Sequence, residues 1–228
     1  MIRWKTVLGH IPGFNWISFI RSNARAQWFD WRHRVKTRGD EDPRSLTVVG
    51  GNVAHALPYI PTTARFGRHL LRDLPIKDVS SYTFIDMGSG KGRMLLLAAE
   101  LPFRRIIGVE FSRDLQILAQ NNVKTYRNRK QVCFQIETVN QDATEYKFPP
   151  DPLLVYFFFP FDRPVMEPVI QNLNRSLVEH PRDVIVVYHN PILSDLVEAA
   201  SHLRIYARGS HLKSSYTVFR SSFRSTGE

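Results

Sequence analysis

Short apolar runs alternate along this chain with longer segments of helical periodicity. Five of the apolar runs predict strands, at residues 82–85, 105–110, 131–139, 152–158 and 183–188. The run at 152–158 is apolar almost throughout, which is typical of a strand buried at the centre of a sheet. In 131–139 the pattern alternates, so Val132, Phe134 and Ile136 are expected on one face.

The segments between these runs carry apolar residues three or four positions apart, which is typical of helices that cover a sheet. The predicted helices are residues 24–38, 64–74, 94–100, 113–129, 164–178 and 192–200. Ser112 is the expected N-cap of the helix at 113–129. Residues 203–207 and 216–219 flank Arg208-Gly209-Ser210 and predict an antiparallel pair that closes the sheet. Alternating strands and helices predict an α/β, Rossmann-like fold with a mostly parallel sheet and a C-terminal antiparallel strand.

The first predicted strand leads into Asp86 and then into three glycines spaced two apart, Gly88, Gly90 and Gly92. Glycines permit a tight turn and let a ligand approach the backbone. The diphosphate-binding fingerprint has a different spacing, Gly-x-Gly-x-x-Gly. A carboxylate that faces such a turn favours a cationic amino-acid ligand. Glu110 ends the next strand, 24 residues after Asp86, close to the position of a ribose-binding acid in a βαβ unit.

These two motifs together resemble the class I S-adenosylmethionine-dependent methyltransferases. Residues 86–92 are similar to the first motif of that family and 108–110 to the second. The resemblance implies a seven-stranded methyltransferase sheet and S-adenosylmethionine as cofactor. It also implies that Asp142 binds the adenine amino group with Ala143 against the ring. The implied cofactor-binding residues at the two motifs are Asp86, Gly88, Ser89, Gly90, Gly92, Glu110 and Phe111.

The Pro-Thr element at 61–63 extends the resemblance to one branch of these enzymes. It is similar to an element of the protein-lysine methyltransferases related to the ATP-synthase c-subunit enzyme, and to one in a group of small bacterial methyltransferases. The resemblance implies that Thr62 and Thr63 border the methionine end of the cofactor and that Tyr59 closes the pocket. A helix cap is the alternative role of the two threonines, and the two roles are compatible.

The acceptor site is expected after the fourth and fifth strands. Amine-methylating relatives carry Asn/Asp-Pro-Pro-Tyr where this chain has Phe158-Phe159-Pro160-Phe161, so Phe159, Pro160 and Phe161 are the predicted acceptor-binding residues. This chain lacks the asparagine or aspartate of that motif, but an aromatic wall can hold a lysine by a cation–π contact. The predicted catalytic residues are His189 as a base near neutral pH, Asn190 to orient the acceptor, and Tyr59. A capped turn before the helix at 192–200 is the alternative explanation for polar residues at positions 189 and 190.

Charge separates the ends of the chain from its middle. The net charge is +10, and residues 1–50 hold nine basic and four acidic side chains. We predict a basic, aromatic-rich extension at 1–45 and a methyltransferase domain at 46–228. The helix at 24–38 is expected to bury an aromatic face and expose a basic one. Basic ends suit nucleic acid, an anionic membrane or an acidic protein, and a merely solvated surface is the alternative.

The chain lacks the features of disulfide-rich, metal-binding and membrane-spanning proteins. A single cysteine excludes an internal disulfide framework, and no metal-spaced cluster of His, Asp or Cys is visible, so no metal is expected. No apolar stretch reaches the roughly 18 residues of a membrane span. The protein is expected in the cytoplasm, with membrane association through its N-terminal segment as an alternative.

Three functions are compatible with these patterns. The first is methyl transfer to a protein side chain such as lysine. The second is the same chemistry on RNA, DNA or a small molecule. The third is a non-catalytic relative that binds a nucleotide or a partner.

Overall fold

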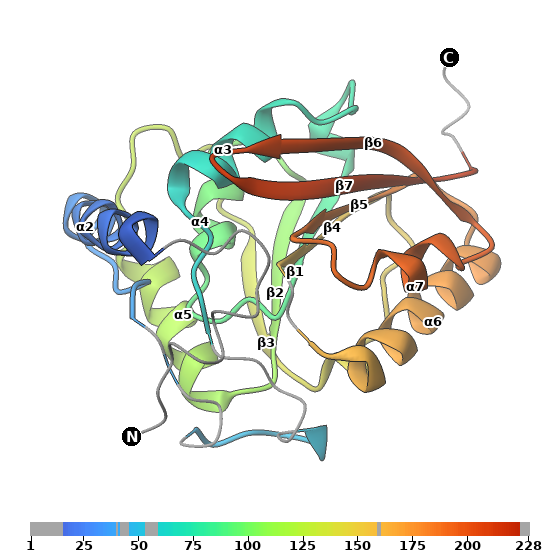
Figure 1. The fold of residues 1–228 in the computed structure, drawn as a ribbon, viewed down its shortest axis with the longest axis horizontal. Helices are drawn as coiled ribbons and strands as arrows, with labels where there is room; N and C mark the ends of the chain where they lie inside the picture. The colour runs from blue at the N-terminus through green and yellow to red at the C-terminus, as the bar shows by residue number, and fades with distance from the viewer. Residues whose placement is uncertain (1–15, 40, 42–45, 53–58, 159–160, 224–228) are drawn as a thin grey trace.

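One seven-stranded sheet organises the molecule, with strand order β3-β2-β1-β4-β5-β7-β6 (Figure 1). The computed structural model describes residues 16–39, 41, 46–52, 59–158 and 161–223, with the side chains from residue 25 onward. Strands β1 to β5 are parallel, and β7 pairs antiparallel with both β5 and β6. The strands are β1 Thr83–Met87, β2 Arg105–Glu110, β3 Ile136–Asn140, β4 Leu153–Phe158, β5 Val184–His189, β6 Leu203–His211 and β7 Ser214–Ser221.

Helices cover both faces of this sheet. Figure 1 shows α3, α4 and α5 on the side where α2 also lies, with α6 and α7 on the other side. The helices are α2 Trp16–His33, α3 Ala64–Arg72, α4 Arg93–Ala98, α5 Arg113–Thr125, α6 Arg163–Glu179 and α7 Ser194–Glu198, with 3-10 turns at Val79–Ser81 and Ala143–Glu145. This mixed, mostly parallel α/β arrangement confirms the predicted fold class.

Alternating strand residues divide the core into two hydrophobic layers, because successive side chains of a strand point to opposite faces. Ile85, Val155 and Val186 pack with α6 and α7 in one layer. Phe84, Leu154 and Ile185 are in the other layer with residues from α3 and α4. Strand β4 is buried between β1 and β5, as its apolar sequence predicts.

The described part of the N-terminal extension belongs to the second layer. Phe29 and Val35 are buried in the same cluster as Phe66, Leu96 and other residues of the domain. Only one of the three aromatic side chains at 28–31 is buried, however, since Trp28 and Trp31 are 59% and 75% exposed. The prediction that this helix buries an aromatic face is therefore wrong for both tryptophans. The helix ends at His33 because Arg34 takes a left-handed conformation, φ 60°.

Two further differences from the sequence prediction concern the start of a strand and the position of a turn. Val132 and Phe134 lie before β3 and are exposed, because the strand begins only at Ile136. The turn between β6 and β7 is at Leu212 and Lys213, which both have positive φ, and not at 208–210. Gly209 is inside β6 and is packed under Tyr216, since a Cβ there would lie 2.5 Å from the tyrosine ring.

Candidate functional site

Polar side chains from four neighbouring strands project from the same face of the sheet, at its carboxyl-terminal edge. They are Glu110 on β2, Asp86 on β1, Tyr156 on β4 and His189 on β5. On each strand, the residue is an even number of positions from a residue of the hydrophobic layer that includes α3 and α4. Side chains two positions apart in a strand point to the same face, so all four point to the side of those helices. In open α/β sheets, ligands bind outside the carboxyl ends of the strands, and the order here reverses between β1 and β4.

Glu110 is buried and tied to the backbone of the glycine turn. Its Oε2 accepts a hydrogen bond from the Gly90 N–H at 2.7 Å, and its Oε1 accepts one from the Ser112 N–H at 2.9 Å. Burial raises the pKa of Glu110 to about 7, against the lowering effect of these backbone donors. Each carboxylate oxygen has a second lone pair, so the group can still accept hydrogen bonds from a ligand.

Asp86 is 4% exposed, and no group within the described ranges donates a hydrogen bond to its carboxylate. Burial, and then the nearby charge of Glu110, raise the pKa of Asp86 to about 8. The Ser89 hydroxyl in the adjacent turn is also buried without a hydrogen-bond partner among the described residues. The Asp86 carboxylate and the Ser89 hydroxyl can therefore both form hydrogen bonds with a ligand at the glycine turn.

Tyr59 packs directly on the glycine turn. Gly90 has φ +52°, and a Cβ at this position would lie 2.2 Å from the Tyr59 ring, so only glycine fits. The Tyr59 hydroxyl donates to the Thr37 carbonyl at 2.7 Å, and the Lys91 ammonium lies 5.2 Å from the ring centroid. Burial raises the pKa of this phenol, against the lowering effect of Arg93 and with the nearby carboxylates of Asp30, Asp86 and Glu110 raising it further, so the phenol stays protonated.

A chain of hydrogen bonds connects Thr62 to His189 through Tyr156. The Thr62 and Tyr156 hydroxyl oxygens are 2.7 Å apart, and the Tyr156 oxygen is 2.9 Å from His189 Nδ1. The imidazole stacks on Phe158, with the ring centroids 3.9 Å apart, and contacts Phe66 on its other side at 4.2 Å. Burial lowers the pKa of His189 to about 3, so this side chain is neutral and only weakly basic at neutral pH.

The segment 46–52 lies against Phe111 and Asp142, two of the residues for which the resemblance implies cofactor contacts. The Val49 N–H donates to the Phe111 carbonyl at 3.0 Å, and Asn52 donates to Asp142 Oδ2 at 2.8 Å. Gly50 comes so close to Asp142 that a Cβ would lie 2.3 Å from its carboxylate. This part of the candidate pocket is therefore covered by the start of the predicted domain.

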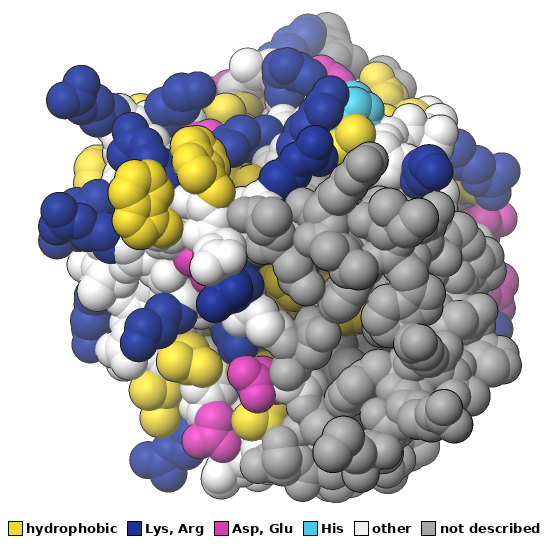
Figure 2. All heavy atoms as spheres, turned by 60° about the vertical axis from the view of Figure 1, so that its left-hand side comes forward, with side chains coloured by type: hydrophobic (Ala, Val, Ile, Leu, Met, Phe, Trp, Pro, Cys, Tyr) yellow, Lys and Arg dark blue, Asp and Glu magenta, His cyan; other side chains and the backbone are white. Residues whose placement is uncertain are grey.

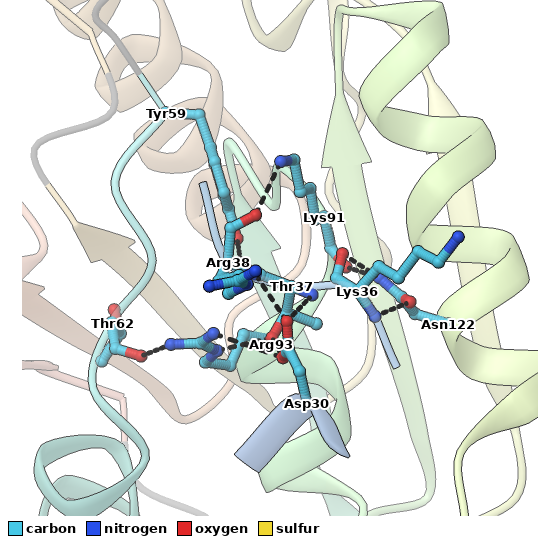
Figure 3. Close-up of polar contacts among 9 residues, drawn as sticks. All are labelled: Asp30, Lys36, Thr37, Arg38, Tyr59, Thr62, Lys91, Arg93 and Asn122. Carbon is cyan, nitrogen blue, oxygen red and sulfur yellow. Dashed lines mark hydrogen bonds and ion pairs between the residues drawn. The ribbon is translucent and has the colours of Figure 1, made fainter. Parts of the chain in front are cut away.

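The loop after α2 is fastened to α4 by a buried network around Arg93 (Figure 3). Arg93 Nε donates to the Thr37 hydroxyl at 2.7 Å, and its guanidinium is 3.5 Å from Asp30 Oδ1. Asp30 also accepts hydrogen bonds from the Thr37 and Arg38 backbone N–H groups. The extension is thus connected to the helix that begins immediately after the glycine turn.

Lys91 and Asn122 form a second connection to the same loop (Figure 3). The Lys91 ammonium donates to the Arg38 carbonyl and to Glu41, both at 2.8 Å. Asn122 on α5 accepts from the Lys36 N–H at 2.7 Å and donates to the Lys91 carbonyl at 2.9 Å. Lys91 of the glycine motif and Arg93, the first residue of α4, therefore both contact the loop after α2.

The structure brings most of the predicted site residues together. Thr63 is the N-cap of α3, as predicted, and accepts a hydrogen bond from Phe66 N. Asn190 has positive φ and lies half-buried after β5. Phe161 is part of the hydrophobic core, whereas Phe159 and Pro160 lie outside the described residues. Their assigned roles stay predictions.

Several residues around the site were not anticipated from the sequence. Tyr156 falls in an apolar run, and Asp30, Thr37 and Arg93 carry no motif, so nothing in the sequence pattern marks them. Their partners are distant in the chain, as for Arg93 and Thr37 or Tyr156 and Thr62. In the ranges that the structure describes, no three His, Cys, Asp or Glu side chains are grouped to hold a metal ion.

Comparisons with known proteins agree with this architecture. No protein-family model and no curated protein sequence matches the chain. The chain is similar to yhhF, a proposed methyltransferase of Escherichia coli, with a TM-score of 0.55 and 16% identity over 80% of this chain and 98% of that one. It is also similar to HI0767, a proposed methylase of Haemophilus influenzae, with a TM-score of 0.50 and 16% identity over 70% and 99% of the two chains. At this identity the likeness shows the fold alone, and the chain has the seven-stranded, Rossmann-like fold of class I methyltransferases.

Proposed function

We propose that this protein is a methyltransferase that uses S-adenosylmethionine. The observation that carries the proposal is the buried Asp86 carboxylate, which accepts no hydrogen bond from the described residues and lies beside a glycine turn and a second buried acid. A ligand that carries positive charge together with hydroxyl and ammonium donors satisfies both carboxylates. A diphosphate would place further negative charge beside them, so a dinucleotide fits this site poorly.

The residues present suit each part of S-adenosylmethionine. Glu110 would accept from the ribose hydroxyls, and Asp86 with the glycine turn would hold the cationic amino-acid end. Phe111, Asp142 and Ala143 would enclose the adenine. When bound, S-adenosylmethionine supplies an activated methyl group, and the chain mainly has to position the acceptor beside it. Such positioning contributes roughly 7–11 kcal/mol to catalysis.

The acceptor proposed first is a protein side chain such as lysine. Support comes from the Pro-Thr element at 61–63 and from aromatic side chains near the carboxyl end of β4, where Phe158 stacks on His189. The deeply buried, neutral His189 is better suited to positioning Tyr156 than to removing a proton. A nucleic acid is the second candidate acceptor, and the exposed tryptophans and arginines of α2 favour it.

Calorimetric titration with S-adenosylmethionine tests the cofactor proposal, with NAD as the control ligand. We expect binding of the first ligand and none of the second. Asp86→Asn and Glu110→Gln should each weaken binding at least about tenfold, whereas Glu137→Gln, an exposed acid on β3, should not change it. Binding of NAD, or wild-type affinity in the Asp86 variant, would contradict the proposal.

Methyl transfer in a cell lysate tests the acceptor. The purified enzyme and S-adenosylmethionine with a radioactive methyl group are added, and the labelled material is digested with protease or with nuclease. Label that protease releases supports a protein acceptor, and label that nuclease releases supports the nucleic acid. Label confined to small molecules would exclude both.

A further inference from the structure

The outward stripe of α2 and the loop after it presents tryptophans among unpaired cations. We call this surface the α2 face and define it by Arg25, Trp28, Trp31, Arg32, Lys36 and Arg38. Within α2, Arg25, Trp28 and Arg32 are three, four or seven residues apart and Trp31 is three residues after Trp28, so these four side chains lie on one side of the helix. Lys36 and Arg38 follow in the loop. Figure 2 shows this side of the molecule, with hydrophobic side chains set among many Lys and Arg and few acids.

The charges on this face are not neutralised within the part of the chain that is described. Arg25, Arg32, Lys36 and Arg38 are exposed and form no ion pair with a described residue. The one acid between residues 25 and 38, Asp30, is buried and holds Thr37 and Arg93. The face therefore carries a positive field that attracts an anionic partner.

A cavity of about 470 Å³ opens beside Trp31. Its other walls are Gln27, Asp30, Val35, Lys36, Arg38, Lys91 and Leu118. The volume falls within the range of small-ligand pockets, about 300–1,000 Å³. The lining combines an aromatic ring with three cations, a side-chain amide and one carboxylate, Asp30, which is already bound to Thr37 and paired with Arg93. A base that stacks on a ring, with its phosphate near a cation, needs these same groups.

We propose that the α2 face binds single-stranded nucleic acid. The exposed Trp28 and Trp31 rings would stack on unpaired bases, the arginines and Lys36 would contact phosphates, and the cavity beside Trp31 would receive one nucleotide. A duplex keeps its bases stacked inside, so it cannot use the tryptophans in this way. The proposal does not depend on methyl transfer, because the α2 face contains none of the residues assigned to the cofactor or the acceptor.

An anionic membrane fits these observations less well. A helix that lies in a membrane interface buries a broad apolar face. Outward residues of the described part of α2 include only two large apolar side chains, both tryptophan and both beside an arginine. A concave pocket with charged walls also has no counterpart in a flat lipid surface.

Fluorescence anisotropy with the full chain tests the proposal. The probes are labelled single-stranded RNA, single-stranded DNA of the same sequence, the corresponding DNA duplex, and vesicles of phosphatidylserine and phosphatidylcholine. We expect both single strands to bind more tightly than the duplex or the vesicles. All four tryptophans of the chain lie within residues 1–31, so quenching of intrinsic fluorescence reports directly on this region.

Two variants separate stacking from charge. Trp28→Ala with Trp31→Ala should weaken binding of the single strand at least about 30-fold, since each lost stack costs about fivefold or more, and leave the salt dependence unchanged. Arg25→Gln with Arg32→Gln and Lys36→Gln should reduce the slope of log affinity against log salt by about 2, at roughly 0.7 for each lost phosphate contact. Tyr206→Ala and Arg175→Gln, an exposed aromatic residue on β6 and an exposed cation on α6, are the matched controls.

The outcomes that overturn the proposal are distinct. Equal affinity for duplex and single strand would show that charge alone attracts the nucleic acid. Vesicle binding without binding of either single strand would assign the face to a membrane. Unchanged affinity in both face variants, or the same loss in the control variants, would place the binding elsewhere. Each of these results leaves the S-adenosylmethionine titration unaffected, so failure here is distinguishable from failure of the proposed activity.

Discussion

Asp86 and Glu110 are two buried carboxyl groups whose pKa values rise to about 8 and about 7. Their ordinary pKa values are near 4, so between about pH 4 and 8 the folded chain binds more protons than the unfolded chain. The two acids therefore lower the free energy of unfolding as the pH rises through this window. A cationic ligand offsets this effect, because it favours the ionised carboxylates.

The affinity for S-adenosylmethionine should consequently increase with pH. Between about pH 6 and 8.5 the two carboxyl groups lose their protons, and each ionised group attracts the cationic ligand more strongly. Calorimetric titration across this range measures the effect. Glu137→Gln should keep the same pH dependence, and a flat profile in the wild-type protein would show that neither acid contacts the charged end of the ligand.

Replacing Asp86 by asparagine should stabilise the chain while it weakens ligand binding. At pH 8 we expect the free energy of unfolding of Asp86→Asn to exceed that of the wild type by about 1 kcal/mol or more, since the burial cost of an ionised carboxylate is lost. At pH 4 the difference should vanish because the acid is then protonated. Urea unfolding at the two pH values measures both, and destabilisation at pH 8 would mean that Asp86 holds the fold together.

At the scale of elements, the connection of α2 to α4 depends on Asp30. This one carboxylate accepts from the Thr37 hydroxyl at 2.6 Å, from two backbone N–H groups, and pairs with Arg93. Both charges are buried, Asp30 at 7% exposed and Arg93 at 3%. Removal of one partner from a buried pair leaves the other charge uncompensated.

Asp30→Ala should therefore lower the free energy of unfolding by about 3–5 kcal/mol. The matched control is Asp195→Ala, which breaks a pair with Arg163 in which both side chains are more than half exposed, 58% and 51%. An exposed pair contributes about 0–1 kcal/mol. Chemical unfolding of both variants measures the contrast, and equal losses would show that the Asp30 network does not hold the extension in place.

At the scale of the whole molecule, α2 shares one hydrophobic layer with the sheet. Phe29 and Val35 pack in the cluster that also holds Phe84 and Leu154. A helix that is part of a common core is expected to unfold together with it, because small single domains unfold cooperatively.

The position of the tryptophans makes this cooperativity measurable. Tryptophan fluorescence reports only on residues 1–31, whereas far-ultraviolet circular dichroism reports on all helices and strands. We expect the two thermal transitions to coincide within about 2 °C. An earlier fluorescence transition would mean that the extension detaches from an intact domain.

Among the described residues, no helix combines the length and the apolar character that a membrane span requires.

Local features of this structure follow from short sequence patterns. Strand β2 begins and ends at the predicted residues, 105 and 110, and Ser112 and Thr63 cap the expected helices. Apolar periodicity and capping hydroxyls act over a few neighbouring residues, so they can be recognised in the sequence. The glycine turn and the two acids that end neighbouring strands were visible for the same reason.

Long-range contacts were decided only by the tertiary structure. Tyr156 meets Thr62 and His189, Arg93 meets Asp30, and Gly50 meets Asp142 because folding brings distant segments together. The low pKa of His189 has the same origin, since Phe66 and Phe158 exclude water from both sides of its ring. Periodicity also did not predict that Trp28 and Trp31 are exposed. They are exposed because Phe29 and Asp30 occupy the inward side of α2. Burial and charge at a site depend on the neighbours that the whole fold supplies, and a local pattern does not contain them.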